Sequence, residues 1–115
     1  MYTKEQLKQM HKKANKLKNS LFRAYTACNS TVYTEQNTEE LNSVKEYVAF
    51  KIDLLTGILS ILETALKDNN GKISEEQISE LNELKQQFNT LSKDVYLSRL
   101  QQIYTRKVNA EFVSI

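Results

Sequence analysis

The sequence contains no proline and no tryptophan, and its only glycines are Gly57 and Gly71. Because proline and glycine are the residues that most often interrupt helices and form tight turns, their scarcity leaves few places for the chain to reverse. A single cysteine, Cys28, excludes an intramolecular disulfide, and a single histidine, His11, cannot form a metal site alone. The composition therefore favours long helices over a small fold held together by disulfides or a metal.

Long apolar runs are also missing from the sequence. No stretch approaches the ~20 consecutive apolar residues that a membrane-spanning helix needs. The first residues, Met1 to Glu5, lack the apolar segment of a secretory signal peptide. We therefore expect a cytoplasmic protein, and the length of 115 residues predicts a single domain over residues 1–115.

The charged residues are unevenly distributed along the chain. Residues 1–28 hold seven basic residues and one acidic residue, a net charge of +6. Residues 29–92 hold five basic and eleven acidic residues, a net charge of −6, and residues 93–115 have a net charge of +2. Such asymmetry predicts that different parts of the chain attract partners of opposite charge, including partners within the same fold.

Hydrophobic periodicity predicts an all-α fold, an antiparallel bundle of three long helices over about residues 4–28, 38–68 and 75–112. Capping boxes, in which a side chain at each end satisfies a backbone N–H, mark the three helix starts. The pairs are Thr3 with Gln6, Asn37 with Glu40, and Ser74 with Gln77. The short loop between the second and third helices makes them an antiparallel hairpin.

The first helix carries one apolar seam with the spacing of a coiled coil. The seam consists of Leu7, Met10, Ala14, Leu17, Leu21, Ala24 and Cys28. The second helix carries two adjacent stripes, which together cover roughly 200° of its surface and predict that it is the central helix. The first of these stripes is Leu41, Val44, Val48, Ile52, Leu55, Leu59, Leu62 and Leu66, and the second is Tyr47, Phe50, Leu54, Ile58, Ile61 and Ala65.

Two residues of the second helix stand out from these stripes. Lys51 falls within the apolar arc, where it either extends its amino group to solvent or pairs with a carboxylate and fixes the helix register. Gly57 lies in the middle of the helix, at a cost of ~1 kcal/mol relative to alanine. We expect another element to approach the helix closely at Gly57.

The apolar stripe of the third helix changes face near residue 95. Either the chain breaks there and forms a fourth helix, or one continuous helix buries its two halves against different surfaces. The residues after the change form what we term the C-terminal stripe: Tyr96, Leu97, Leu100, Ile103, Tyr104, Val108 and Phe112. In a continuous helix this stripe has no cover within the chain, and it then predicts an interface for a protein partner or for a homodimer.

The first helix also carries a basic surface opposite its seam, which we term the lysine face. Its members are Lys4, Lys8, Lys12, Lys16 and Arg23. Such a face either binds an anion, such as nucleic-acid phosphate or an acidic protein, or is simply solvated. The scarcity of arginine and the lack of interleaved aromatic residues weaken the nucleic-acid interpretation.

The sequence predicts no catalytic residues, no cofactor and no metal ion. The segment from Asp68 to Gly71 is similar to part of an EF-hand loop, but the first and last ligand positions fall on Leu66 and Gln77. The leading hypothesis is a small protein-interaction module: an adaptor, inhibitor, immunity or chaperone-like factor. Nucleic-acid binding through the lysine face is the alternative, and a structural subunit of a larger assembly is the second alternative.

Overall fold

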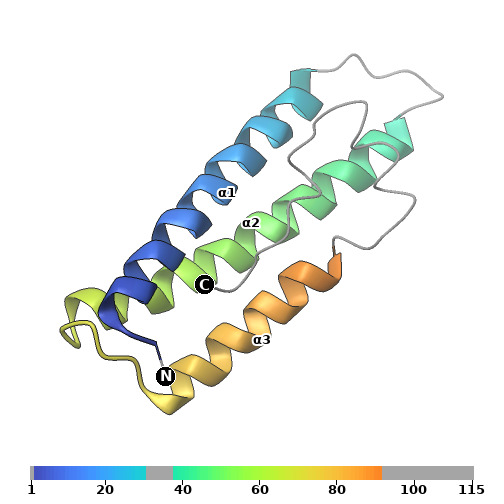
Figure 1. Ribbon diagram of the computed structural model, residues 1–115. Helices are drawn as coiled ribbons and strands as arrows, with labels where there is room; N and C mark the ends of the chain where they lie inside the picture. Colours follow the sequence, from blue (N-terminus) through green and yellow to red (C-terminus); the bar gives the residue numbers. More distant parts are fainter. Residues whose placement is uncertain (1, 31–37, 92–115) are drawn as a thin grey trace.

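The computed structural model describes residues 2–30 and 38–91. These residues form three helices, α1 (Lys4–Ser30), α2 (Thr38–Lys67) and α3 (Glu75–Leu91). Figure 1 shows α2 packed between the other two, with α1 and α3 both antiparallel to it. The three-helix, all-α architecture expected from the sequence is confirmed. Whether residues 75–112 form one helix or two lies outside the described residues.

The starts of α1 and α3 follow directly from the sequence. At the start of α1, the Thr3 N–H donates to Gln6 Oε1 at 2.9 Å, and the Gln6 N–H donates to Thr3 Oγ1 at 3.1 Å. At the start of α3, Ser74 and Gln77 make the same reciprocal pair at 3.0 and 3.1 Å. Each pair satisfies two backbone donors that the first turn of a helix leaves without partners, which confirms both capping boxes.

The turn between α2 and α3 depends on positive backbone φ angles. Asn70 has a φ of 54° and Gly71 a φ of 84°, and the Gly71 N–H donates to the carbonyl of Ala65 at 2.8 Å. This bond satisfies one of the carbonyls that the last turn of α2 leaves free. The buried side chain of Ile73 then anchors the chain before α3 begins.

The core lies along α2, because its two apolar stripes face different neighbours. Tyr2, Leu17, Tyr25, Ile61, Leu66, Ile78 and Leu84 pack against the buried core while remaining partly exposed. The fully or nearly fully buried hydrophobic residues are Leu7, Met10, Ala14, Leu21, Tyr47, Val48, Ile52, Leu54, Leu55, Ile58, Leu59, Leu62, Ala65, Ile73, Leu81 and Phe88. The predicted seam of the first helix is confirmed as far as Leu21, since the side chains of Ala24 and Cys28 are outside the described set.

Gly57 lies where α3 comes close to α2. A Cβ atom placed on Gly57 would lie 3.2 Å from Leu84 Cδ1 of α3, which is tighter than an ordinary van der Waals contact. The close approach expected at this glycine is therefore confirmed. The backbones of α1 and α3, by contrast, do not approach each other in the described chain, so α2 is the common support of both.

Candidate protein-interaction surface

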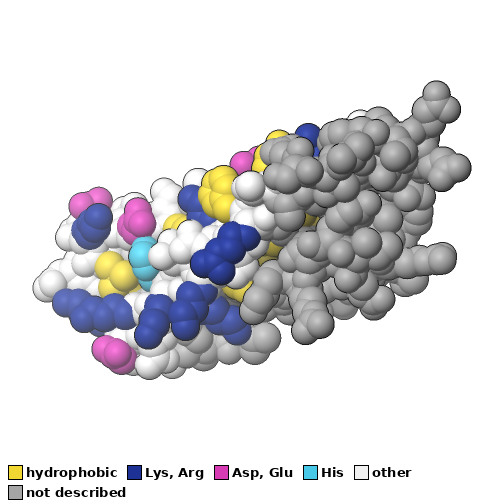
Figure 2. Space-filling view, turned by 90° about the horizontal axis from the view of Figure 1, so that it is seen from above, with side chains coloured by type: hydrophobic (Ala, Val, Ile, Leu, Met, Phe, Trp, Pro, Cys, Tyr) yellow, Lys and Arg dark blue, Asp and Glu magenta, His cyan; other side chains and the backbone are white. Residues whose placement is uncertain are grey.

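The lysine face is exposed. Lys4, Lys8, Lys12, Lys16 and Arg23 are all exposed side chains of α1, and the stem of Lys4 also covers Gly71 in the turn after α2. Figure 2 shows dark-blue lysine and arginine side chains gathered along one edge of the described part of the molecule. All five residues are exposed, as their helical spacing predicts, and the role of this face as a binding surface stays a prediction.

The edge of α1 that borders α2 makes specific polar contacts instead. His11 Nε2 lies 3.2 Å from Glu63 Oε1 of α2, and Lys45 Nζ of α2 lies 5.7 Å from the centre of the Tyr25 ring. These contacts hold the two helices in register at both ends of their interface.

Every residue of the C-terminal stripe, from Tyr96 to Phe112, lies outside the described residues. Their role as an interface therefore stays a prediction. The described part of α3 ends at Leu91, five residues before the stripe begins, so any apolar surface near Leu91 is close in sequence to the predicted interface.

Lys51 is fully buried, and its amino group does not reach solvent. Its Nζ lies 4.4 Å from the centre of the Phe88 ring and 5.2 Å from the centre of the Tyr47 ring. A desolvated ammonium against aromatic faces gains cation–π attraction. The alternative in which Lys51 extends to solvent is wrong, because the aromatic rings of α2 and α3 hold the amino group inside the fold.

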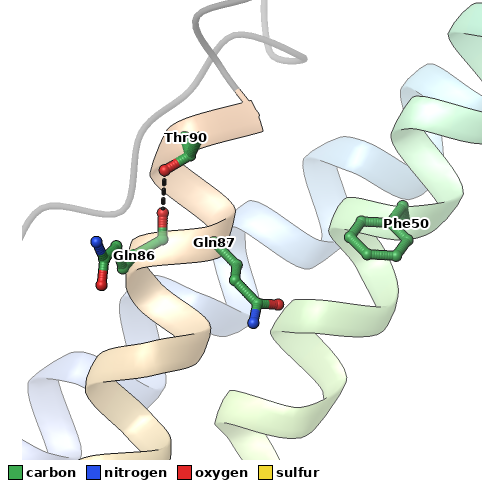
Figure 3. Close-up of a pocket in the computed structure, with 4 residues that line it drawn as sticks. All are labelled: Phe50, Gln86, Gln87 and Thr90. Carbon is green, nitrogen blue, oxygen red and sulfur yellow. Dashed lines mark hydrogen bonds between the residues drawn. The ribbon is translucent and has the colours of Figure 1, made fainter.

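Phe50 is the residue at which the second stripe of α2 leaves the core. The sequence places Phe50 among buried residues, but its side chain is 52% exposed. It borders an open hollow of about 370 Å³ lined also by Gln86, Gln87 and Thr90 of α3. In Figure 3, Gln87 reaches from α3 toward α2 and Phe50, while Thr90 Oγ1 donates to the Gln86 carbonyl at 2.8 Å. Sequence periodicity does not reveal this exposure, because it does not specify how far α3 covers α2.

The hollow continues along the seam between α2 and α3. A second hollow, also about 370 Å³, shares Gln87 with the first. Its other lining residues are Gly57, Ser60 and Ile61 of α2 and Glu80, Glu83 and Leu84 of α3. Together the two hollows form what we term the α2–α3 groove, and from Phe50 to Ile61 it is ~16 Å long at 1.5 Å per helical residue.

The α2–α3 groove has an acidic border. Glu80 and Glu83 line it directly, and Glu76 projects from the same side of α3 at the helical spacing. Glu46 and Asp53 of α2 are exposed and lie within about 60° of Phe50 on the helix, at 100° per residue. The groove therefore combines an apolar floor with negative charge.

The described residues hold neither a metal cluster nor a membrane-spanning helix. Among the residues that the structure describes, no three His, Cys, Asp or Glu side chains are grouped so as to hold a metal ion. None of the helices in residues 2–30 and 38–91 combines the length and apolar character that crossing a bilayer requires. Comparison with family models, with curated proteins and with solved structures finds no match to this chain. The groove and the lysine face are thus the two candidate interaction surfaces of the described residues.

Proposed function

We propose that this protein is a small, non-enzymatic protein-interaction module that acts in the cytoplasm as a homodimer or with another protein. An adaptor, inhibitor, immunity or chaperone-like role fits this proposal. The observation that carries it is the half-exposed Phe50 beside the open α2–α3 groove. An exposed aromatic side chain next to an apolar hollow is typical of an interaction site.

The shape of the groove favours a helical partner segment. The antiparallel helices α2 and α3 form the two sides of the groove, and its floor contains Gly57 and Ser60. A groove of this shape fits the common recognition mode in which an amphipathic helix lies in an apolar groove. The C-terminal stripe adds a second predicted apolar surface, which begins shortly after α3.

The experiment is light scattering on a sizing column at low and high salt, with the wild-type chain and the variants Phe50→Asp, Leu100→Asp and Tyr104→Asp. We expect the wild-type chain to self-associate or to bind a protein partner, and at least one variant should lose this interaction. An interaction through the C-terminal stripe should tolerate salt. Circular dichroism confirms that each variant remains helical. If all three variants keep every interaction of the wild-type chain, the proposal is wrong.

The lysine face supports a second candidate function, nucleic-acid binding. Its five exposed basic residues match the spacing of a helix that follows a phosphate backbone. If all five contact phosphates, the affinity for double-stranded DNA should fall with salt with a log–log slope of about −4.5. The variant with Lys8→Glu, Lys12→Glu and Lys16→Glu should lose that binding, and fluorescence anisotropy with a labelled duplex measures it. If DNA binding is unchanged both by salt and in this variant, the lysine face is not the DNA-binding surface.

A further inference from the structure

Two exposed aromatic residues mark two different surfaces of the molecule. Phe50 borders the α2–α3 groove, and Phe22 projects from the outer side of α1 with 49% of its surface exposed. Phe22 lies beside the lysine face, and Lys18 Nζ is 6.0 Å from the centre of its ring. Large aromatic side chains left this exposed are favoured anchors for protein–protein contacts.

The two surfaces have opposite charge. The outer side of α1 combines Phe22 with exposed lysines, whereas the groove combines Phe50 with the exposed carboxylates of α3. Complementary charge of this kind guides the encounter of two surfaces and sets the register in which they dock. Because α1 and α3 lie on different sides of α2, one molecule cannot close its own α1 onto its own groove.

The spacing of the charges also matches. Counting back along α1 from Phe22, Lys16, Lys12 and Lys8 lie roughly 9, 15 and 21 Å away at 1.5 Å per residue. Counting back along α3 from Thr90, which lines the groove beside Phe50, Glu83, Glu80 and Glu76 lie roughly 10, 15 and 21 Å away. An α1 helix laid parallel to α3 therefore places each lysine at the same level along the axis as one carboxylate when Phe22 is beside Phe50.

We propose that the occupant of the α2–α3 groove is α1 of a second copy of this chain. In this arrangement Phe22 of one copy enters the hollow beside Phe50 of the next, and Lys8, Lys12 and Lys16 face the acidic border of α3. This inference rests on the proposed function, which it makes specific by naming the partner and the two contacting surfaces. The contact is head-to-tail, because each copy contributes a different surface.

A head-to-tail contact has consequences that a symmetric dimer lacks. A pair of copies keeps one free groove and one free α1 face, so association continues into longer chains as the concentration rises. Since the Lys–Glu pairs lie at the exposed border, salt screens them and weakens the association. A symmetric dimer through the C-terminal stripe would instead stop at two copies and tolerate salt.

The test uses two full-length variants that each remove one surface, Phe22→Asp and Phe50→Asp. Sedimentation velocity at low salt should show concentration-dependent association of the wild-type chain and a monomer for each variant alone. An equimolar mixture should form a dimer and nothing larger, because the Phe22→Asp groove accepts α1 of the Phe50→Asp chain. Thr56→Asp, which adds the same charge to an exposed position of α2 away from the groove, serves as the control and should associate like the wild-type chain.

Exchanging the charges of the two surfaces tests the same contact independently. Glu80→Lys with Glu83→Lys should abolish association, as should Lys12→Glu with Lys16→Glu. Mixing the two double variants should restore concentration-dependent association, with the two chains alternating, because both the exchanged and the original pairs of surfaces are then complementary. A wild-type chain that is monomeric at low salt, a mixture of the two aromatic variants that stays monomeric, or a Phe22→Asp chain that still associates would overturn the inference. The proposed function survives that result if Tyr104→Asp or Leu100→Asp abolishes an interaction, so the two failures are distinguishable.

Discussion

At the scale of single residues, Gly57 determines how close α3 comes to α2. Helix propensity alone favours Gly57→Ala by up to ~1 kcal/mol, but the new Cβ would lie 3.2 Å from Leu84 Cδ1. Because Leu84 is partly exposed and its side-chain end is flexible, we expect Gly57→Ala to change the free energy of unfolding by less than ~1 kcal/mol. Gly57→Leu should destabilise the protein by ~1–3 kcal/mol through overpacking.

Urea denaturation of both Gly57 variants, with Thr56→Leu as the matched control on the neighbouring exposed position, measures this difference. A Gly57→Leu variant that is as stable as the wild-type chain would mean that α3 does not rest on α2 at this point.

Lys51 contributes to the core through its methylene groups as well as through its charge. Its side chain is fully buried and its amino group contacts the Phe88 and Tyr47 rings. Lys51→Ala removes the whole side chain and should destabilise the protein by ~2–4 kcal/mol, as expected for truncation of a long buried side chain. Lys51→Met keeps most of the volume, so we expect it to be the more stable of the two variants by at least ~1 kcal/mol. Equal midpoints in thermal unfolding would show that the charge, and not the packed stem, carries the contribution.

At the scale of helices and turns, the start of α1 packs against the α2–α3 turn. A Cβ atom on Gly71 would lie 2.6 Å from Lys4 Cγ, so the stem of Lys4 covers this glycine. Gly71→Ala meets both that contact and the positive φ of 84°, and we expect a loss of ~1–3 kcal/mol. In a Lys4→Ala background the loss should be smaller, because only the backbone strain and the shorter side chain remain.

A double-mutant cycle on Lys4 and Gly71 separates the two causes. A coupling energy near zero would show that backbone conformation alone excludes alanine at position 71.

The helices were predictable because their signals are local. The capping pairs Thr3–Gln6 and Ser74–Gln77 lie three residues apart, and each forms as the spacing predicts. The exposure of Phe50 and the burial of the Lys51 amino group were not predictable, since both depend on how α3 lies across α2. The exposed lysine face was predicted from helical spacing, whereas the α2–α3 groove needs two helices that are distant in sequence.

At the scale of the whole molecule, the three helices should differ in the free energy of local opening. Within residues 2–30 and 38–91, α2 is the only helix that packs against both of the others. Helices that depend on one neighbour open more readily than the helix that supports them. We therefore expect amide hydrogens of α2 between Val48 and Leu62 to exchange with deuterium most slowly, and those of α3 to exchange faster.

The variant Leu81→Ala tests this gradation directly. Leu81 is fully buried on α3, and its truncation should weaken the α2–α3 contact by ~2–5 kcal/mol. Hydrogen exchange measured by mass spectrometry should then rise strongly in α3 and only weakly in α1, because α1 packs on α2 and its backbone does not approach that of α3. Since the α2–α3 groove exists only while α3 is in place, the same variant should also lose association in the sedimentation experiment. Equal increases in α1 and α3 would instead show that the three helices unfold as one cooperative unit.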